Sequence, residues 1–404
     1  MPPKEEKGVE NDSILVINSG SSSIKYKLMN PETGEEIASG IVEQIGEERS
    51  RIKHVYHDVE EKMVRSVRDH LEGMAVVEEL FEKIGPSLQE SQVVGVGHRI
   101  VQGGPYFSGP AIIDKNVYSL IEELCPLGPL HNPAHLKGID AAKRILPDVP
   151  HVAAFDTAFF NHLPEKAYTY ALKRSVAEKY RIRRYGAHGT SHQYVSQRVC
   201  SILGNDDLKQ IVLHLGNGAS ASAIVGHHPV ETSMGLTPLE GLVMGGRTGD
   251  IDPAAVFHLY REAGMDIEEI DELFNRQSGM KGLTGHNDMR EIWKLLEAGD
   301  SQAEIALEIY LHRLLKYVGA YWAVLGGLDA LTFTAGIGEN DPGIRWELCR
   351  SLAFMGVKID QEINEQRFSH EAIISTPDSK VKVLVVPTNE ELAIAQQVYS
   401  LVKF

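Results

Sequence analysis

Residues 14–28 read ILVINSGSSSIKYKL: an apolar run, then a turn rich in glycine and serine, then a run in which apolar and polar side chains alternate. Alternation with a period of two predicts a strand with one buried face, so we expect two strands joined by a tight polar turn. Residues 211–225, IVLHLGNGASASAIV, repeat the pattern in the middle of the chain. The repeat predicts a duplicated architecture, with one such unit in each of two domains.

The rest of the chain alternates strands with helices. The stretch LTFTAGIGEN at 331–340 is expected to run from a buried strand into a glycine-rich turn, and 302–325 has the apolar spacing of a long helix. Residues 383–386 predict another buried strand, and 390–402 a closing helix with Asn389 as its N-cap. The alternation indicates an α/β fold.

The length supports two domains, since the chain has 404 residues and a compact domain typically holds roughly 100–200. We place an N-terminal α/β domain at 1–156, completed by the C-terminal helix at about 391–404. A C-terminal α/β domain takes 157–390. This boundary follows from where the second unit begins, because no low-complexity linker marks it.

The composition argues against several classes of protein. The net charge of −16 disfavours a nucleic-acid binder, because phosphate backbones are held by Lys and Arg. The three cysteines are widely spaced, which fits a reducing cytoplasm better than a disulfide framework or a metal cluster. No stretch reaches the roughly 18 apolar residues of a membrane span. Residues 1–12 are charged and lack the apolar core of a secretory signal, so we interpret them as a frayed extension.

Two of the glycine-rich turns have the composition of phosphate-binding turns. Small residues let backbone N–H groups approach phosphate oxygens, and serine hydroxyls add donors. Residues 18–23 and 216–220 both qualify, although neither matches a P-loop or a dinucleotide-binding fingerprint. Ordinary hairpin turns are the alternative interpretation. A third such stretch at 334–340 favours phosphate binding.

Two arginines stand beside glycine turns. Arg99 follows an apolar run in GVGHRIVQGG (95–104), and Arg247 lies in GGRTGD (245–250). A guanidinium donates two parallel hydrogen bonds, which suits a carboxylate or a phosphate. The alternative is that both are surface arginines in loops.

Histidines and carboxylates add further candidates. His188 and His192 have the spacing of metal ligands, but Gly189 between them and the lack of an HExxH motif argue against a zinc site. An imidazole that donates a hydrogen bond to a phosphoryl oxygen fits His188 better. Asp156 ends an apolar run and Glu390 begins the last helix, positions suited to carboxylates that hold Mg²⁺ beside phosphates. Helix capping is the alternative for Glu390.

Taken together, these segments resemble the acetate kinase family over nearly the whole chain, from about Ile14 to Gln396. No single motif identifies the family, but the presence of so many motifs in the same order is very specific to it. The matching stretches are NSGSSSIKYKL (18–28), GHRIVQGG (97–104), PLHNPAHL (129–136), AFDTAFF (154–160), RYGAHGTSHQYV (184–195), HLGNGASASA (214–223), ETSMGLTPLEGLVMGGRTGDIDP (231–253), FTAGIGEN (333–340) and PTNEE (387–391).

The resemblance implies the ribonuclease-H-like fold shared by sugar kinases, heat-shock chaperones and actin. That fold has two α/β domains of duplicated origin, with nucleotide in the inter-domain cleft. The resemblance also implies an enzyme that transfers a phosphoryl group reversibly from ATP to acetate, giving acetyl phosphate and ADP, with Mg²⁺ (or Mn²⁺). Its partners would be a small carboxylate and a nucleotide, and it would be a cytoplasmic homodimer.

By the same resemblance, Arg99 and Arg247 would hold the carboxylate and the moving phosphoryl group, and His188 would hydrogen-bond that group in flight. Asp156 would be the catalytic acid. The residues implied for substrate binding are Arg99, Val101, Leu130, His131, Ala187 and Pro238. The residues implied for the nucleotide are Asn18, Ser21, Ser23, Lys25, His214, Gly216, Asn217, Gly218, Asp288, Met289, Arg290, Gly336, Ile337, Gly338, Glu339 and Asn340, and those for the metal are Asn18 and Glu390.

Physical chemistry favours a simple mechanism for this reaction. The acceptor carboxylate is already a nucleophile, so direct in-line transfer is expected without a strong base or a phospho-enzyme. The site must hold two anions in line and disperse charge over the phosphoryl oxygens. This account requires the guanidinium groups of Arg99 and Arg247 to meet in one inter-domain groove, opposite the terminal phosphate of the nucleotide.

Two positions depart from the family pattern. Ala187 stands where the family often has Phe lining the acyl pocket, which leaves room for propionate or butyrate. Each buried methylene is worth about 0.8 kcal/mol, so we expect a modest shift in preference. Val101 still matches the acetate-type pocket, and Glu231, in place of the more usual Asp, is expected to change little.

Two other functions are alternatives to that of an acetate kinase. A propionate or butyrate kinase is the nearest one within the enzymes, and the intact FTAGIGEN segment favours ATP over pyrophosphate as donor. A nucleotide-gated binding protein related to actin or the chaperones shares the fold, but it has no use for Arg99, Arg247 and His188 together.

Overall fold

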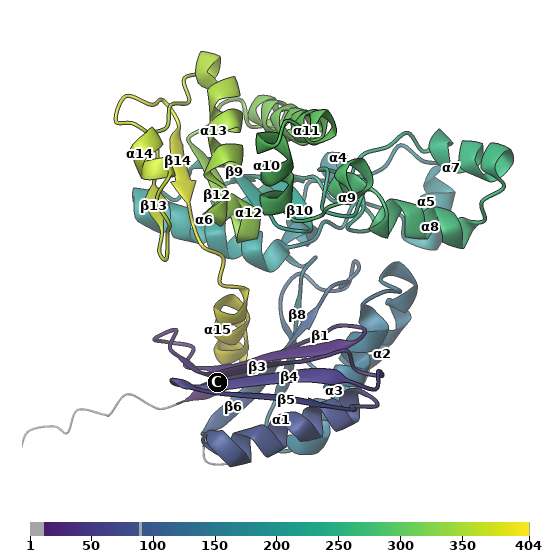
Figure 1. The fold of residues 1–404 in the computed structure, drawn as a ribbon. Helices are drawn as coiled ribbons and strands as arrows, with labels where there is room; N and C mark the ends of the chain where they lie inside the picture. The colour runs from purple at the N-terminus through teal and green to yellow at the C-terminus, as the bar shows by residue number, and fades with distance from the viewer. Residues whose placement is uncertain (1–11, 89–90, 404) are drawn as a thin grey trace, which may run out of the picture. The chain divides into compact units, whose positions relative to one another are not determined.

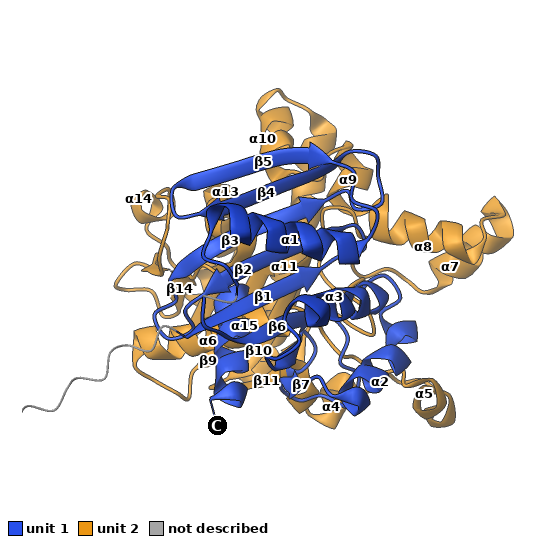
Figure 2. Ribbon diagram, turned by 90° about the horizontal axis from the view of Figure 1, so that it is seen from below, with its two compact units in different colours: residues 1–158, 389–404 blue, residues 159–388 orange. Residues whose placement is uncertain are grey.

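The computed structural model describes residues 12–88 and 91–403, and the chain divides into two compact units. Unit 1 comprises residues 1–158 and 389–404, and unit 2 comprises 159–388, as coloured in Figure 2. The sequence predicts domains at 1–156 with about 391–404, and at 157–390.

Unit 1 is built on an eight-stranded sheet with the order β5-β4-β3-β2-β1-β6-β8-β7 (Figure 1). Strands β1 to β5 form an antiparallel meander, β6 lies parallel to β1, and β8 lies parallel to β6. The short β7 closes the sheet antiparallel to β8. The strands are β1 (Ser13–Ser19), β2 (Ser23–Met29), β3 (Glu36–Glu43), β4 (Ser50–Tyr56), β5 (Val59–Arg65), β6 (Val93–Ile100), β7 (Ala111–Ile112) and β8 (His151–Phe155).

Unit 2 carries a six-stranded sheet with the order β11-β10-β9-β12-β14-β13. Strands β9, β10 and β11 are antiparallel, β12 and β14 continue the sheet parallel to β9, and β13 is antiparallel to β14. The order and directions of these six strands match those of β3-β2-β1-β6-β8-β7 in unit 1. The predicted α/β class and duplication are therefore confirmed. The strands are β9 (Lys209–Leu215), β10 (Ala219–Val225), β11 (His228–Thr232), β12 (Ala330–Thr334), β13 (Ala372–Ile373) and β14 (Lys382–Val385).

Helices occupy the connections between the strands. Those of unit 1 are α1 (His70–Ile84), α2 (Lys115–Glu123), η1 (Cys125–Leu127), α3 (Asn132–Ile145) and α15 (Glu390–Val402). Those of unit 2 are η2 (Phe159–His162), α4 (Glu165–Tyr168), α5 (Arg174–Tyr180), α6 (Gly189–Leu203), α7 (Ala254–His258), the π-helical η3 (Leu259–Ala263), α8 (Ile267–Arg276), α9 (Gly279–Thr284), α10 (Met289–Glu297), α11 (Ser301–Leu325), α12 (Ala335–Asn340), α13 (Pro342–Ser351), η4 (Ala353–Met355) and α14 (Gln361–Asn364).

Successive residues of the central strands enter different cores, as side chains that alternate along a strand require. In β1, Leu15 packs with α1 and α3, whereas Ile14 packs with α15. In β9, Ile211 packs with α11, whereas Val212 packs with α6. The helix α15 follows the last strand of unit 2 in the chain, yet it packs on β1 and β6 of unit 1. The central strands β1 and β9 are therefore buried on both faces, which explains their nearly continuous apolar runs.

Most of the elements expected from the sequence are confirmed. The closing helix begins at Glu390, and the Asn389 side chain accepts a hydrogen bond from the Leu392 N–H at 3.0 Å, as an N-cap does. The prediction of a glycine-rich turn after β12 is wrong, because α12 begins there. Ala335 takes a left-handed φ of 64°, and its N–H donates to Glu339 Oε1 at 2.8 Å, which starts the helix.

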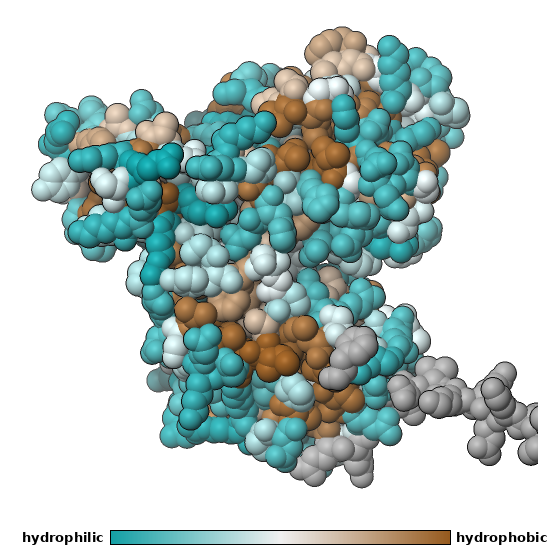
Figure 3. All heavy atoms as spheres, turned by 180° about the vertical axis from the view of Figure 1, so that it is seen from behind, coloured by the Kyte–Doolittle hydropathy of each residue, from teal (hydrophilic) through white to brown (hydrophobic). Residues whose placement is uncertain are grey.

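None of the helices in the described part of the chain combines the length and the apolarity that crossing a membrane requires. On the face drawn in Figure 3, hydrophilic residues predominate and apolar ones gather in smaller patches.

Candidate functional site

In unit 1, a buried carboxylate and an arginine meet where two parallel strands end. Arg99 lies near the end of β6, opposite Ala154 of β8, and Asp156 follows β8 directly. Arg99 Nη2 donates to Asp156 Oδ2 at 2.8 Å, and Nε donates to both carboxylate oxygens at 3.1 and 3.2 Å. Asp156 is only 2% exposed. Because side chains at the carboxyl ends of neighbouring parallel strands point into the same region, this pair follows directly from the sheet.

Glu390 joins this cluster from the first turn of α15. Its Oε2 lies 3.4 Å from Arg99 Nη1. Burial raises the pKa of Glu390, and the charges of Asp156 and Glu391 raise it further against the opposing effect of Arg99. Burial alone would lower the pKa of Arg99, but the two carboxylates raise it above its ordinary value. The cluster therefore holds more negative charge than its cation neutralises, which is a setting that a further cation would relieve.

The first glycine–serine turn joins β1 to β2 beside this cluster. The Gly20 N–H donates to the Ser23 carbonyl at 2.8 Å, and the Gly20 carbonyl lies 2.7 Å from His70 Nε2. Ser21 is exposed at the tip of the turn, and Asn18 lies half-buried near the end of β1. The Lys25 ammonium forms an ion pair with Glu391 Oε1 at 2.6 Å.

The substrate residues expected in unit 1 lie on two segments. Val101 follows β6, and His131 is the N-cap residue of α3, with Leu130 before it 46% exposed. The His131 ring stacks on His135 at a centroid distance of 6.4 Å. Burial, followed by the charges of His131 and Arg99, lowers the pKa of His135 to about 3, so His135 is neutral.

In unit 2, a chain of histidines and serines fixes the imidazole of His188. His188 has a left-handed φ of 59° and precedes α6, and its Nδ1 lies 2.9 Å from Ser220 Oγ. His192, one turn further along α6, lies 2.7 Å from the same hydroxyl through Nε2. The ring of His214 stacks on that of His188 at 4.1 Å. Burial, and then the charge of His214, lowers the pKa of His192 well below its usual value, so His192 acts as a neutral support.

Arg247 lies beside this histidine, with Gly218 between the two. A Cβ built on Gly218 would lie 3.5 Å from both Arg247 Nη1 and His188 Cε1, so the two side chains flank this glycine. Arg247 Nη1 donates to the Pro238 carbonyl at 3.1 Å. Within residues 12–88 and 91–403, no carboxylate forms an ion pair with Arg247, and burial lowers its pKa. A half-buried guanidinium in this setting is suited to an external anion.

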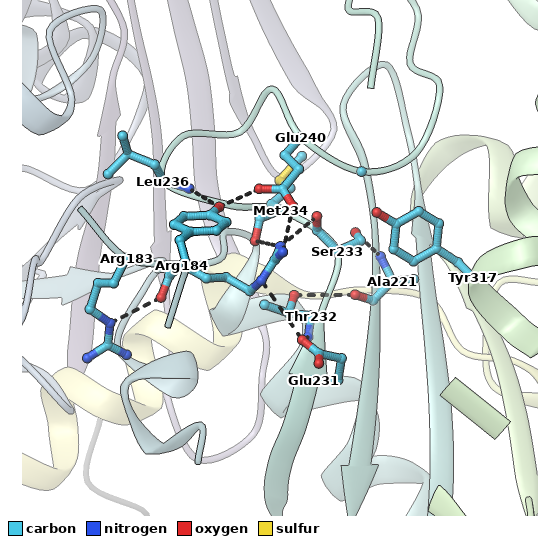
Figure 4. A network of polar contacts seen from close by, with 12 residues as sticks. Arg183, Arg184, Ala221, Glu231, Thr232, Ser233, Met234, Leu236, Glu240 and Tyr317 are labelled. Atoms are coloured by element: carbon cyan, nitrogen blue, oxygen red, sulfur yellow. Dashed lines mark hydrogen bonds and ion pairs between the residues drawn. The ribbon is translucent and has the colours of Figure 1, made fainter. Parts of the chain in front are cut away.

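The loop that carries Pro238 is held by a second arginine (Figure 4). Arg184 Nη1 donates to the carbonyls of Ser233 and Met234 at 3.1 and 3.0 Å. Its Nη2 donates to Glu240 Oε1 at 2.5 Å, and Tyr170 donates to the other oxygen of that carboxylate. These bonds fix both ends of the loop, so Arg184 positions the carbonyl against which Arg247 rests.

A cavity of about 970 Å³ lies in unit 2 next to the second glycine turn. Its lining includes Gly216, Asn217, Asp288, Met289, Arg290, Gly336, Ile337, Glu339 and Asn340, all expected from the sequence to contact nucleotide. Gly218 and His214 belong instead to the histidine cluster. Gly338 packs on β12, where a Cβ would lie 3.3 Å from the Phe333 carbonyl carbon.

Some side chains that line the cavity form hydrogen bonds and ion pairs with the segments that make up its walls. Asp288 caps α10 and forms a two-point ion pair with Arg290, at 2.6 Å for Nη2 and Oδ2, and these hydrogen bonds lower the Asp288 pKa to about 2. Glu339 accepts from the N–H groups of Ala335 and Thr388 at 2.8 and 3.0 Å. Both backbone donors thus occupy the same oxygen of Glu339, Oε1.

Sequence reasoning missed a large part of the cavity lining, namely Asn287, Trp293, Asp341, Pro342, Gly343, Glu365, Gln366 and Arg367. Asp341 accepts from Trp293 Nε1 at 2.8 Å and caps α13. The buried Arg345 donates to the Gly338 and Glu339 carbonyls at 2.9 Å and to the Asn364 carbonyl at 2.6 Å. It thereby joins α12 to the segment that leads to Arg367. Only the Asp-Pro-Gly at 341–343, directly after FTAGIGEN, offered a signal for any of these residues.

The chain was compared with known proteins. A model described as the Acetokinase family matches residues 13–396. The acetate kinase of Leifsonia xyli subsp. xyli is 52% identical over 387 residues, which cover 95% of this chain and 98% of that protein. The crystal structure of Porphyromonas gingivalis acetate kinase superposes with a TM-score of 0.92 at 42% identity, covering 96% of this chain and 99% of that one. A propionate kinase from Francisella tularensis gives 0.90 at 40% identity, with 96% and 99% covered.

Proposed function

The chain belongs to the acetokinase family, and from this premise we propose that it transfers a phosphoryl group reversibly between ATP and acetate, giving acetyl phosphate and ADP. The observation that carries the proposal is the half-buried Arg247, with no carboxylate partner in the described chain, beside an imidazole held by two neighbours. A binding protein that only senses nucleotide has no need for a second anion site of this kind.

We assign the chemistry as follows. A carboxylate oxygen of acetate attacks the γ-phosphorus of ATP, and the bond from that phosphorus to the β–γ bridging oxygen breaks, leaving ADP. Arg247 and His188 donate hydrogen bonds to the oxygens of the moving phosphoryl group, where charge develops. Arg99 is held by Asp156 so that its guanidinium points in one direction, and it orients the acetate and phosphoryl oxygens. The proposal requires both sets of groups to act on the same phosphoryl group.

The carboxylates of unit 1 fit a divalent cation. Asp156, Glu390 and Glu391 surround Arg99 and Lys25 with an excess of negative charge, and the Glu390 pKa is already raised by its surroundings. We propose that Glu390, with Asn18, holds Mg²⁺ or Mn²⁺, both of which prefer oxygen ligands. When bound, the metal would neutralise charge on the β- and γ-phosphates. The structure supports this by its charge balance alone.

We place the nucleotide in the cavity of unit 2, with phosphates toward Asn217 and the base toward α12. Gly336 has no atom within 4 Å of a built Cβ, so the cavity is open at that point of its wall. We further propose that the protein is cytoplasmic and forms a homodimer. Measurement of its molecular mass by sedimentation would test the dimer.

The acyl preference has a second candidate. Ala187 is 2% exposed in the core of unit 2, directly before His188, and one similar solved structure is that of a propionate kinase. The family often has Phe at this position, and the smaller side chain is the reason to propose propionate as the alternative substrate, whose extra methylene would be worth about 0.8 kcal/mol when buried.

A hydroxamate assay with acetate, propionate and butyrate, run with ATP and then with pyrophosphate, tests the function. We expect acetate and ATP to give the highest kcat/KM. Absence of acyl phosphate with every acid would overturn the proposal. Highest kcat/KM with propionate would instead replace acetate by the alternative.

The acid limb of the pH–rate profile should report Glu390. Its carboxylate must be ionised to hold a cation, so kcat/KM is expected to rise with pH through a pKa above the ordinary carboxyl value. Glu391→Gln removes a neighbouring negative charge, which lowers the Glu390 pKa, so the limb should move to lower pH. Glu79→Gln, which removes an exposed carboxylate on α1, should leave the limb in place. A limb that stays fixed in Glu391→Gln would exclude Glu390 as its source.

Gly336→Val should raise the KM for ATP by about tenfold or more while leaving the Tm unchanged. The added side chain enters open space in the cavity, so it competes with nucleotide without straining the fold. Gly319→Val is the matched control, because Gly319 also has nothing within 4 Å of its Cβ position but lies on α11, outside the cavity lining. Equal effects of the two substitutions on KM would show that the nucleotide binds elsewhere.

A further inference from the structure

Three potential metal ligands from separate segments of unit 2 converge away from the groups assigned to phosphoryl transfer. Cys200 lies near the end of α6, Asp206 in the loop that follows, and His227 in the turn between β10 and β11. The thiol sulfur, a carboxylate oxygen and an imidazole nitrogen all lie within 4.8 Å of one another. None of these residues has a role in the proposed reaction.

The spacing of the three atoms is close to that of a bound transition metal. His227 Nε2 lies 3.3 Å from Asp206 Oδ1. In a tetrahedral zinc site with bonds of about 2.0–2.3 Å, neighbouring ligand atoms are about 3.3–3.8 Å apart. The imidazole and the carboxylate therefore already have the required separation, and the sulfur, which lies within 4.8 Å of both, needs to move by about 1.5 Å at most.

The exposure and hydrogen bonding of the three groups also fit a metal. Cys200 is 2% exposed and forms the floor, whereas the side chains of His227 and Asp206 are 44% and 84% exposed and leave an entry path from solvent. Gln210 Nε2 lies 3.2 Å from Cys200 Sγ and donates to it. Such a donor stabilises a thiolate, as hydrogen bonds around metal-bound sulfur do.

The backbone holds the three segments together before any metal arrives. Gly226 has a φ of 58°, and a Cβ there would lie 2.4 Å from the Asp206 carbonyl oxygen, so the β10–β11 turn sits directly on the Asp206 loop. The Gly226 N–H donates to the Leu208 carbonyl at 2.8 Å, and the Asn205 N–H donates to the Cys200 carbonyl at 3.1 Å. Because the ligands are already arranged, binding the metal loses less conformational entropy.

We propose that Cys200, Asp206 and His227 bind one divalent transition-metal ion of the zinc class, with water in the remaining position. Thiolate and imidazole select such ions over Mg²⁺, which takes oxygen ligands, so this site and the proposed magnesium site discriminate by chemistry. On binding, the Cys200 S–H bond breaks, the proton goes to solvent and the sulfur bonds to the metal. The ion would then link the end of α6, the helix that begins after His188, to the β10–β11 turn.

Co²⁺ titration of the full chain, treated with chelator and kept in excess Mg²⁺, tests the site by absorbance. We expect one equivalent of Co²⁺ to produce thiolate-to-cobalt charge-transfer absorption, which added Zn²⁺ removes. Cys200→Ser should abolish the absorption, and His227→Ala should weaken Co²⁺ binding at least tenfold. The readout involves no phosphoryl transfer, so it stands or falls separately from the proposed function.

Two matched variants control for stray binding. His228→Ala removes the exposed histidine next to His227, and Cys125→Ser removes a half-buried thiol in unit 1, and both should titrate as the unaltered chain does. Zn²⁺ should raise the Tm of the unaltered chain and of these controls but not that of His227→Ala, because it binds the folded state only at the complete site. Should Cys200→Ser fail to fold, Asp206→Asn and His227→Ala, both on the surface, decide the matter. No charge-transfer absorption in the unaltered chain, or equal absorption in His227→Ala, overturns the proposal.

Discussion

Arg247→Ala is expected to lower kcat by about 10²–10³-fold and to leave the Tm close to that of the unaltered chain. The guanidinium donates to developing charge on the phosphoryl oxygens, and that contribution is largest in the transition state. Its folded-state contacts are few: one hydrogen bond to the Pro238 carbonyl at 3.1 Å and a contact with Met244 Sδ at 3.8 Å. Since burial lowers the Arg247 pKa, its charge gains nothing from the surrounding protein, and its loss should cost little stability.

The controls for this prediction separate charge from geometry. Arg247→Lys keeps a cation but loses the planar two-point donor, so we expect most of the kcat loss to persist. Arg276→Ala removes an arginine whose side chain is 62% exposed and forms an ion pair with Glu272, and kcat should stay near the unaltered value. Near-normal turnover in Arg247→Ala would remove this residue from the mechanism.

Arg99→Leu is expected to destabilise unit 1 by about 3–5 kcal/mol as well as to abolish turnover. The substitution leaves the buried Asp156 with no cation and removes the nearest positive charge from Glu390. Urea unfolding monitored by circular dichroism measures the loss. Because Arg99 lowers the Glu390 pKa in the folded state, removing it raises that pKa further, so the destabilisation should shrink as pH falls through it.

A double substitution distinguishes the two effects of Arg99. Arg99→Leu combined with Asp156→Leu removes both charges, and unfolding should recover most of the lost free energy, since an apolar pair replaces the buried ion pair. Turnover should stay lost, because the guanidinium is needed for the substrate. If Arg99→Leu unfolds at the same urea concentration as the unaltered chain, the ion pair does not support unit 1.

Much of the fold could be predicted because apolar periodicity follows burial directly. The strands around 14–28 and 211–225, and the pairing of these stretches as a duplication, follow from it. The helix at 302–325 was predicted by spacing, yet Ile305 and Ile309 are 51% and 37% exposed, while Ala303 and Tyr310 are buried. Spacing identifies a helix, whereas the buried face depends on what packs against it.

The candidate site was less predictable where tertiary contacts determine the local structure or which residues line the cavity. The glycines of 333–340 indicated a turn, but Glu339 supplies the acceptor that starts a helix, and no pattern in one sequence shows that. Trp293 and Arg367 reach the cavity only through long-range packing, so nothing local singled them out. The proximity of Asp156 and Arg99 could be predicted, because each lies at the end of a strand, and parallel strands bring such ends together.

The packing of α15 on β1 and β6 has a consequence for biosynthesis. The ribosome makes β1 before it makes unit 2, and it adds α15 only after all of unit 2. Until then, Ile14 and Val16 lack the apolar partners Ile394 and Val398. While unit 2 is being made, a nascent chain therefore carries a sheet with one uncovered apolar face, which is the kind of surface that chaperones hold. Arg99 likewise acquires Glu390 only at that moment, so its charge cluster is complete only after unit 2 has been made.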